Sequence, residues 1–296
     1  MYDELLLTVL LTSVPLILAA TGELVVERSG VLNLGVEGMM LMGAVAGFGV
    51  TSLSGSPYIG MLGGATAGAL TAALFGFFVL GLATNQVATG LALTIFGTGL
   101  SGLIGAPLVG QAIDGLPVFI VPLLSDIPVL GVLFRLDLLA YLSIGLVAGT
   151  SFVLFRTRAG LVIRAVGDNA TSAHALGYSV LKVRFYTVMF GGMMAGLSGA
   201  YLPLVLTPHW AEGMTAGRGW IALALVVFAS WQPWRVVGWR ERYVLIADRV
   251  HRRYCQLSCD APFNGSADVV VGAAHDSLPI RAALVITNCC MSFAMP

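Results

Sequence analysis

Long apolar runs recur along most of the chain, and none of them alternates apolar with polar residues at a period of two. A membrane-spanning helix needs about 20 mostly apolar residues, whereas a strand of a membrane barrel shows such alternation. The pattern therefore predicts an all-α fold, a polytopic transmembrane helical bundle. The predicted spans are residues 5–20, 39–52, 58–82, 87–106, 136–155, 185–206 and 219–231, of which 39–52 needs part of the preceding polar segment to reach spanning length.

Composition agrees with a membrane location. Charged residues make up 10% of the chain, whereas a soluble domain carries about a quarter. The first run follows Asp3 and Glu4 without a basic residue, so we interpret it as a retained span and not as a cleavable signal. The formal net charge is zero and the basic residues form no patch large enough for DNA or RNA, so no nucleic-acid partner is expected.

Basic residues are concentrated in one loop, residues 156–184, which contains a single acid, Asp168. An excess of Lys and Arg in a short loop favours the cytoplasmic side of a membrane. Loop 107–136 has two acids and one arginine, and we expect it to be external. Counting the spans then places the N-terminus and residues 207–218 outside, and the segment around Arg28 at the cytoplasmic side.

Glycines four residues apart occur inside several predicted spans. In lipid, such spacing lets helix backbones approach closely, so we interpret these pairs as packing positions. They are Gly43 and Gly47; Gly60, Gly64 and Gly68; Gly145 and Gly149; and Gly192 and Gly196.

The cytoplasmic loop is predicted to contain a short surface helix. Asp168 or Asn169 suits its N-cap, and Gly177 suits an end in the left-handed conformation. A helix with arginine-rich flanks can insert into a groove on a cytoplasmic protein. The alternative is an ordinary solvated loop.

The segment GELVVERSGVLNLGVEGMM, residues 22–40, places charge and glycine between apolar runs. Polar groups inside a membrane protein usually face the bundle interior or an aqueous path, and broken helices occur at transport sites. One interpretation is a helix interrupted by glycines, with Asn33, Gly35 and Glu37 along the translocation path. The other is a cytoplasmic connector that carries Glu23, Glu27 and Arg28 in water and has no transport role, and both stay open.

Two further polar groups are candidates for function. Thr94, Thr98 and Ser101 share one helical face, where their hydroxyls either meet substrate or bond to neighbouring helices and their own backbone. The external segment 207–218 holds residues that suit docking of a binding protein, although tryptophan also suits the membrane interface. These residues are His209, Trp210, Glu212 and Arg218.

Four segments, in order, resemble permease subunits of bacterial ABC importers, in the nucleoside and simple-sugar branch of the branched-chain amino acid/ribose-type superfamily. They are GELVVERSGVLNLGVEGMMLMGA, NQVATGLALTIFGTGLSGLIG, GLVIRAVGDNATSAHALGYSVLKVRFYTVMFGGMMAGLSGAYL and RGWIALALVVFASWQPWR. The resemblance covers about residues 22–235 and implies a multi-pass protein of the cytoplasmic (inner) membrane that works by alternating access.

The resemblance also implies partners. Two cytoplasmic ATPase subunits would bind the loop helix and hold the ATP and Mg, an extracytoplasmic lipoprotein would deliver substrate, and a second permease, identical or related, would complete the assembly. The coupling residues would be Arg164, Ala165, Gly167, Asp168, Asn169, Ala173, Leu176 and Gly177. The substrate path, by contrast, comes from the residue reading above: Asn33, Gly35, Glu37, Thr94 and Thr98.

The chain itself is not expected to be an enzyme or to hold a cofactor or metal. A phosphate-binding loop ends in Gly-Lys-Ser or Gly-Lys-Thr, and the only lysine, Lys182, lies in Val-Leu-Lys-Val. The spans hold no paired acids, no histidine cluster and no nucleophile with a base. A secondary transporter or channel, in which Glu37 or another acid couples ions, is the alternative.

Residues 236–296 depart from the pattern of the permease domain, residues 1–235. They contain no apolar run near spanning length, all four cysteines and two of the four histidines. We interpret them as an atypical tail, either frame-shifted in place of the last spans, which would leave a non-functional truncated permease, or a genuine cytoplasmic extension. His251, Cys255 and Cys259 are a weak metal motif, because structural zinc sites favour tighter cysteine pairs.

Overall fold

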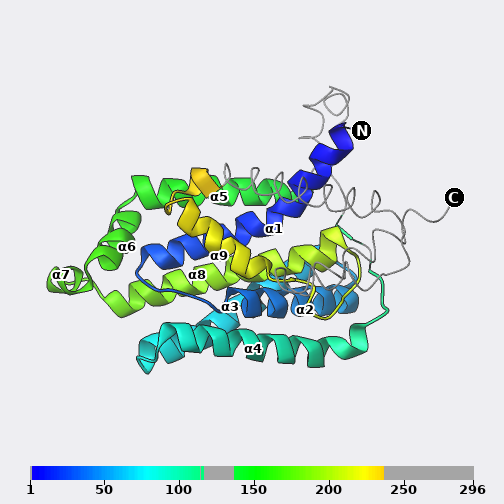
Figure 1. Ribbon diagram of the computed structural model, residues 1–296, viewed down its shortest axis with the longest axis horizontal. Helices are drawn as coiled ribbons and strands as arrows, with labels where there is room; N and C mark the ends of the chain where they lie inside the picture. The colour runs from blue at the N-terminus through cyan, green and yellow to red at the C-terminus, as the bar shows by residue number, and fades with distance from the viewer. Residues whose placement is uncertain (1, 114, 117–136, 237–296) are drawn as a thin grey trace, which may run out of the picture. The chain divides into compact units, whose positions relative to one another are not determined.

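A computed structural model describes residues 2–113, 115–116 and 137–236. The tail from residue 237, with its candidate metal motif, and residues 117–136 of the predicted external loop lie outside the described residues. The described part is helical, apart from one isolated bridge between Ala112 and His209, and the all-α prediction is confirmed (Figure 1). Its α-helices are α1 (Tyr2–Arg28), α2 (Val36–Ser54), α3 (Pro57–Gly76), α4 (Gln86–Gly105), α5 (Leu138–Arg156), α6 (Arg158–Asp168), α7 (Ala170–Ala175), α8 (Val180–Tyr201) and α9 (Arg218–Phe228).

Six described helices are long and apolar enough to cross a membrane. Turns of π-helix extend two of them, so that the spans starting at α3 and α8 run to Gly81 and Leu206. The candidate spans are Leu7–Arg28, Val36–Ser54, Pro57–Gly81, Gln86–Leu108, Leu138–Arg156 and Val180–Leu206. The remaining apolar helix, α9, has only 11 residues, about 16 Å, and is too short to span by itself.

Two predicted boundaries near the first loop were wrong. The first span does not end at residue 20, because α1 continues through Glu23 and Glu27 to Arg28. Gly38 does not interrupt a helix, since it lies in the first turn of α2 and packs against α4. Charge and glycine suggested a break in both places, but tertiary contacts accommodate them within helices.

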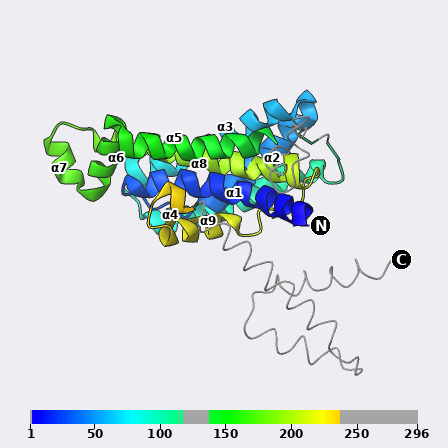
Figure 2. The ribbon, with the colours of Figure 1, turned by 90° about the horizontal axis from the view of Figure 1, so that it is seen from above.

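The loops collect at two ends of the bundle, as the basic residues predicted. At one end α6 and α7 stand beyond the spans, and Gly167 packs on the carbonyl of Arg28 (Figures 1 and 2). At the other end Ile113 donates its N–H to Pro208 O, 3.3 Å away. The described cations of the first end are Arg28, Arg156, Arg158, Arg164, Lys182, Arg184 and Arg235. Because an excess of basic residues favours the cytoplasmic side, this is the end that the sequence predicts to be cytoplasmic, and the opposite end is the predicted external one.

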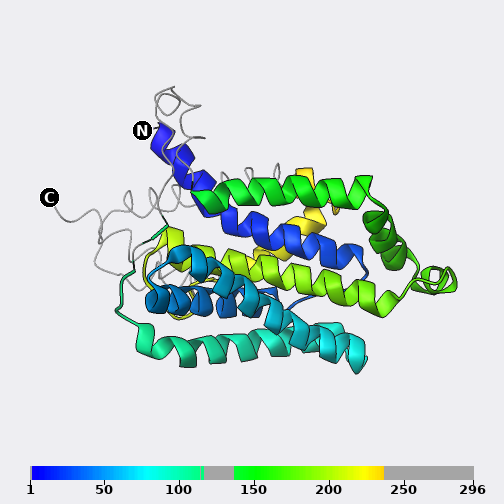
Figure 3. The ribbon, with the colours of Figure 1, turned by 180° about the vertical axis from the view of Figure 1, so that it is seen from behind.

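Glycine contacts join the central helix α8 to α2 and α3 (Figure 3). A Cβ atom on Gly196 would lie 2.8 Å from Gly68 Cα, and one on Gly64 would lie 3.0 Å from Gly43 O. These contacts confirm the packing interpretation for the glycines of α2, α3 and α8. For Gly145 and Gly149 it fails within the described chain, because no atom lies within 4 Å of a Cβ built on either residue.

Replacing Gly196 by valine should destabilise the bundle, because the added side chain meets backbone that cannot rotate away. We expect a loss of roughly 1–3 kcal/mol or more, measured as thermal or detergent-induced unfolding of the purified protein. Gly99→Val on α4 is the matched control, since a Cβ there meets no atom within 4 Å. Equal stability of the two variants would contradict the glycine contact between α3 and α8.

A buried helix junction and a cytoplasmic helix pair

The chain between α1 and α2 turns back into the bundle. Leu32 donates its N–H to Gln86 Oε1 at the start of α4, over 2.8 Å. Helix α2 begins four residues after Leu32, and its first turn packs against α4. A Cβ on Gly38 would lie 2.7 Å from Leu93 O, and Gly97 packs on Gly38. Leu93 and Gly97 lie near the middle of the α4 span, so α2 starts near the mid-depth of the bundle.

Glu23 of α1 holds this returning segment. Its side chain is 1% exposed, and its carboxylate accepts hydrogen bonds from Asn33 N (3.2 Å) and Asn33 Nδ2 (3.4 Å). Asn33 is fully buried, and its Oδ1 accepts from Gly35 N over 3.0 Å. The interpretation of a connector with Glu23 in water is therefore wrong, because that carboxylate serves as an internal acceptor for backbone that leaves a helix.

Glu37 makes a second internal clasp, across 182 positions of the sequence. Its Oε1 accepts from Thr215 Oγ1 (2.6 Å) and Gly217 N (2.7 Å), and its Oε2 accepts from Gly219 N (2.7 Å). The carboxylate thus binds N–H groups at the start of α9 that have no partner within that helix, and its charge suits the positive end of the helix dipole. We call these four residues the α2/α9 junction.

Glycine is required at position 217, the N-cap of α9, and at position 219 in its first turn. Gly217 has φ +82°, in the left-handed region, and a Cβ on Gly219 would lie 2.7 Å from Glu37 Cα. The two helix starts therefore approach each other at backbone distance.

From the junction, α2 and α9 run to opposite ends of the bundle (Figure 1). The last turn of α2 lies at the predicted external end, where Ser52 Oγ lies 3.1 Å from Gln111 Oε1. The turn after α9 lies at the predicted cytoplasmic end, where Trp231 O accepts from Arg28 Nη2 over 3.2 Å and the Trp231 indole donates to Glu27. Discontinuous helices that meet at mid-depth are typical of transport sites.

The hydroxyls on α4 bond to backbone. Thr94 Oγ1 donates to Leu34 O and Gly90 O, both over 3.1 Å, so Thr94 lies against the returning segment. Thr98 is exposed one turn further and donates to Thr94 O, and Ser101 donates to Thr98 O. Bonding to neighbouring and own backbone, one of the two expectations, is thus what the described conformation contains.

The short helix predicted in the cytoplasmic loop is confirmed as α7. Asn169, not Asp168, is its N-cap, since Asn169 Oδ1 accepts from Ser172 N over 3.0 Å. Gly177 follows its end with φ +88°, the left-handed value that glycine adopts without strain. Asp168 is the last residue of the separate helix α6.

Close contacts fix α6 to the bundle. Gly160 packs on Leu154 of α5, and Gly167 packs on the carbonyl of Arg28 at the end of α1. Arg164 is half-buried, with its guanidinium 5.3 Å from the centre of the Phe155 ring. Of the eight predicted coupling residues, four are exposed, namely Asp168, Asn169, Leu176 and Gly177; Ala173 is buried, and Arg164, Ala165 and Gly167 are half-buried.

At the external end the predicted docking residues separate. His209 and Glu212 line a cavity of about 650 Å³ together with residues 109–112. Trp210 also borders it but is 4% exposed and packs over Gly105, so it is a core residue and not a membrane-interface anchor. Arg218 donates to Met214 O at the start of α9, over 3.0 Å.

Sequence reasoning missed one buried polar pair at this end. Tyr201 Oη donates to Asp137 Oδ1 over 3.0 Å, and Ala140 N donates to Asp137 Oδ2 over 3.2 Å. Burial raises the pKa of Asp137 above its usual value. The pair ties the start of α5 to the end of α8, and because its residues are 64 positions apart no local spacing indicated it.

The family model for the permease component of branched-chain amino acid transport systems matches residues 5–239. The chain belongs to this family. It is similar to TsgC13 of Haloferax volcanii, named as a glucose ABC transporter permease, with 43% identity over 75% of this chain and 69% of the relative. It is also similar to the guanosine permease NupQ of Bacillus subtilis, with 34% identity over 77% and 76%, and to the nucleoside permease NupC of Lactococcus lactis, with 31% identity over 76% and 74%.

No solved structure matches the chain. Family membership and the apolar helices establish a multi-pass membrane protein that is a transport component. The predicted permease identity is thereby confirmed over the secondary transporter or channel.

Replacing Glu37 by alanine should loosen the start of α9, because two backbone N–H groups and a hydroxyl lose their acceptor. We expect a destabilisation of roughly 2–4 kcal/mol. Amide hydrogen exchange at residues 217–221 of the purified protein should accelerate at least tenfold. The control is Glu212→Ala, which replaces an exposed acid in the loop before α9. Equal rates of amide exchange in the two variants would contradict a stabilising role for the Glu37 hydrogen bonds.

Proposed function

We propose that this chain is the permease subunit of an ATP-driven importer for nucleosides or simple sugars. Relatives that match over about three quarters of the chain are named for glucose, guanosine and nucleosides. The branched-chain amino acid permease LivH of Methanocaldococcus jannaschii matches over only 36% of it, with 28% identity. The balance of similarity therefore favours neutral, hydroxyl-rich substrates.

The partners follow from the same proposal. Cytoplasmic ATPase subunits bind the exposed surface of α7 and hold the ATP and Mg, so this chain needs no cofactor of its own. A substrate-binding lipoprotein docks at the external end, near His209 and Glu212. A second permease subunit, identical or related, completes the assembly.

The observation that carries the proposal is a continuous series of contacts from α7 to mid-depth. Exposed apolar side chains at and after α7, Leu176 and Tyr178, offer a surface outside the spans. Helix α6 connects that surface by glycine contacts to the end of α1. Arg28 then donates a hydrogen bond to the turn after α9. At its other end, the start of α9 donates a hydrogen bond to Glu37. Movement of the α6–α7 pair would reach the junction through elements that pack at backbone distance.

In this scheme the substrate path runs along the returning segment and α4. The path residues are Asn33, Gly35, Glu37, Thr94 and Thr98. In the described conformation their polar atoms bond to backbone or to other side chains of the protein. A substrate with many hydroxyls would replace those bonds when the junction opens, which is the exchange that alternating access requires.

The surface of α7 gives the first test. Leu176→Asp should abolish co-purification of the co-expressed ATPase partner, and with it uptake. The permease should still fold, because the leucine is 76% exposed. Leu53→Asp is the matched control, an exposed leucine at the opposite end. Retention of the ATPase by Leu176→Asp would contradict the coupling role.

Uptake gives the second test, in cells that express the chain with its neighbouring transport genes. We expect ATP-dependent accumulation of a labelled nucleoside or hexose. Accumulation driven by an ion gradient in ATP-depleted cells would instead support a secondary transporter.

We further propose that the tail is foreign to the permease, since the family match ends at residue 239. A version whose tail is replaced by an apolar helix should then transport at least as well.

A further inference from the structure

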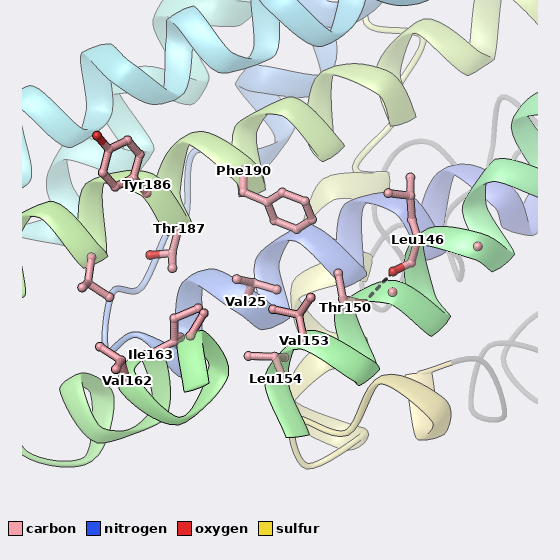
Figure 4. A pocket seen from close by; sticks show the side chains of 14 residues that line it. Val25, Leu146, Thr150, Val153, Leu154, Val162, Ile163, Tyr186, Thr187 and Phe190 are labelled. Atoms are coloured by element: carbon pink, nitrogen blue, oxygen red, sulfur yellow. Dashed lines mark hydrogen bonds between the residues drawn. The ribbon is translucent and has the colours of Figure 1, made fainter. Parts of the chain in front are cut away.

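An apolar groove runs along the outside of α5, between α5, α6 and α8, with α1 as its floor (Figure 4). Its volume is about 520 Å³. Gly145 and Gly149 open its wall, because no atom lies within 4 Å of a Cβ built on either. Its lining includes Thr150 and Val153 of α5, Val162 and Ile163 of α6, and Tyr186 and Thr187 of α8.

The groove offers almost nothing to a polar ligand. Thr150 Oγ1 donates to Leu146 O of its own helix over 2.8 Å, as the dashed line in Figure 4 shows. Thr187 Oγ1 is bonded to Ser29 Oγ and Arg184 O, each over 2.8 Å. Both threonine hydroxyls are therefore engaged within the protein. A sugar or nucleoside would lose hydrogen bonds to water here without gaining hydrogen-bond partners in the protein, so the groove is not part of the substrate path.

The depth of the groove corresponds to one leaflet of a bilayer. Its α5 lining extends from Leu154, two residues before Arg156 at the cytoplasmic end of the helix, to Gly145. These ten residues rise about 14 Å, close to half of the roughly 30 Å hydrocarbon core. An extended hydrocarbon chain from the cytoplasmic leaflet would fill that length.

Cations stand at the cytoplasmic mouth. Arg156 lies three residues after Val153 on α5, Arg158 four before Val162 on α6, and Lys182 four before Tyr186 on α8. This spacing places each cation on the face of its helix that lines the groove. All three are exposed, and none forms an ion pair with another described side chain.

We propose that the groove binds one acyl chain of an anionic phospholipid from the cytoplasmic leaflet, with the phosphate beside Arg156, Arg158 and Lys182. The apolar lining and its depth match the chain, and the charge of the mouth matches the headgroup. The lipid would seal α6 to α5 and α8, next to the helix pair that carries the coupling surface.

Charge disfavours a second copy of the chain in the groove. A second copy related by a two-fold axis through the groove would bring the two cationic mouths into the same region, where they repel.

Native mass spectrometry of the purified full chain tests the proposal. The probes are phosphatidylglycerol and phosphatidylcholine with identical acyl chains. We expect one phosphatidylglycerol retained per chain, and at least about tenfold weaker retention of phosphatidylcholine, because each cation adds to the attraction for the anionic headgroup. The Arg158→Gln and Lys182→Gln double variant, which keeps only Arg156 of the three cations, should lower retention of phosphatidylglycerol most of the way to the phosphatidylcholine level.

Gly149→Leu should abolish retention of both lipids, because its side chain fills the groove. The matched control is Gly99→Leu on α4, an equally open glycine outside the groove, which should retain phosphatidylglycerol normally. Equal retention of the two lipids by the unmodified chain would overturn the headgroup assignment. Undiminished binding by Gly149→Leu would overturn the site, as would a dimer of the chain that this variant alone converts to monomers.

Discussion

A helix that begins inside a bilayer must find partners within the protein for its first backbone N–H groups, because hydrocarbon offers none. Helix α9 begins at mid-depth, and Glu37 supplies that partner with both carboxylate oxygens. The glycine at position 219 follows from this contact, since a side chain there would meet the Glu37 backbone, whereas Gly217 is required by its left-handed backbone conformation. Glu23 does the same for the segment that leads into α2. The interrupted architecture thus depends on two acids that accept hydrogen bonds from backbone.

Two kinds of contact divide the bundle. Helices α2, α3 and α8 meet through glycines at backbone distance, where any rotation produces a clash. Helix α9 meets α2 at backbone distance through Gly219, but side-chain hydrogen bonds also hold its two ends, Glu37 at the start and Glu27 with Arg28 after its end. Hydrogen bonds of that kind can be exchanged for others. The bundle thus combines a glycine-packed frame with hydrogen-bonded attachments at both ends of α9.

The sequence predicted most of the fold because lipid imposes length and apolarity on every span. It also predicted α7, since capping by asparagine and glycine is a local property. It left the role of segment 22–40 open, because the partners of Glu23 and Glu37 lie 10 and up to 182 residues away. Gly145 and Gly149 failed as a packing pair for a related reason. Spacing identifies a face suited to close contact, but not whether the chain itself provides the neighbour.

The clasp at Glu37 also constrains how the protein is made. Its partners, residues 215–219, emerge about 180 residues after it. At a synthesis rate of roughly 5–20 residues per second, that is an interval of about 10–40 seconds. During this interval Glu37 has been synthesised, whereas the residues that donate hydrogen bonds to its carboxylate have not. Glu37 must find other hydrogen-bond donors, such as water, during that interval, so the α2/α9 junction is completed only after α9 has been made.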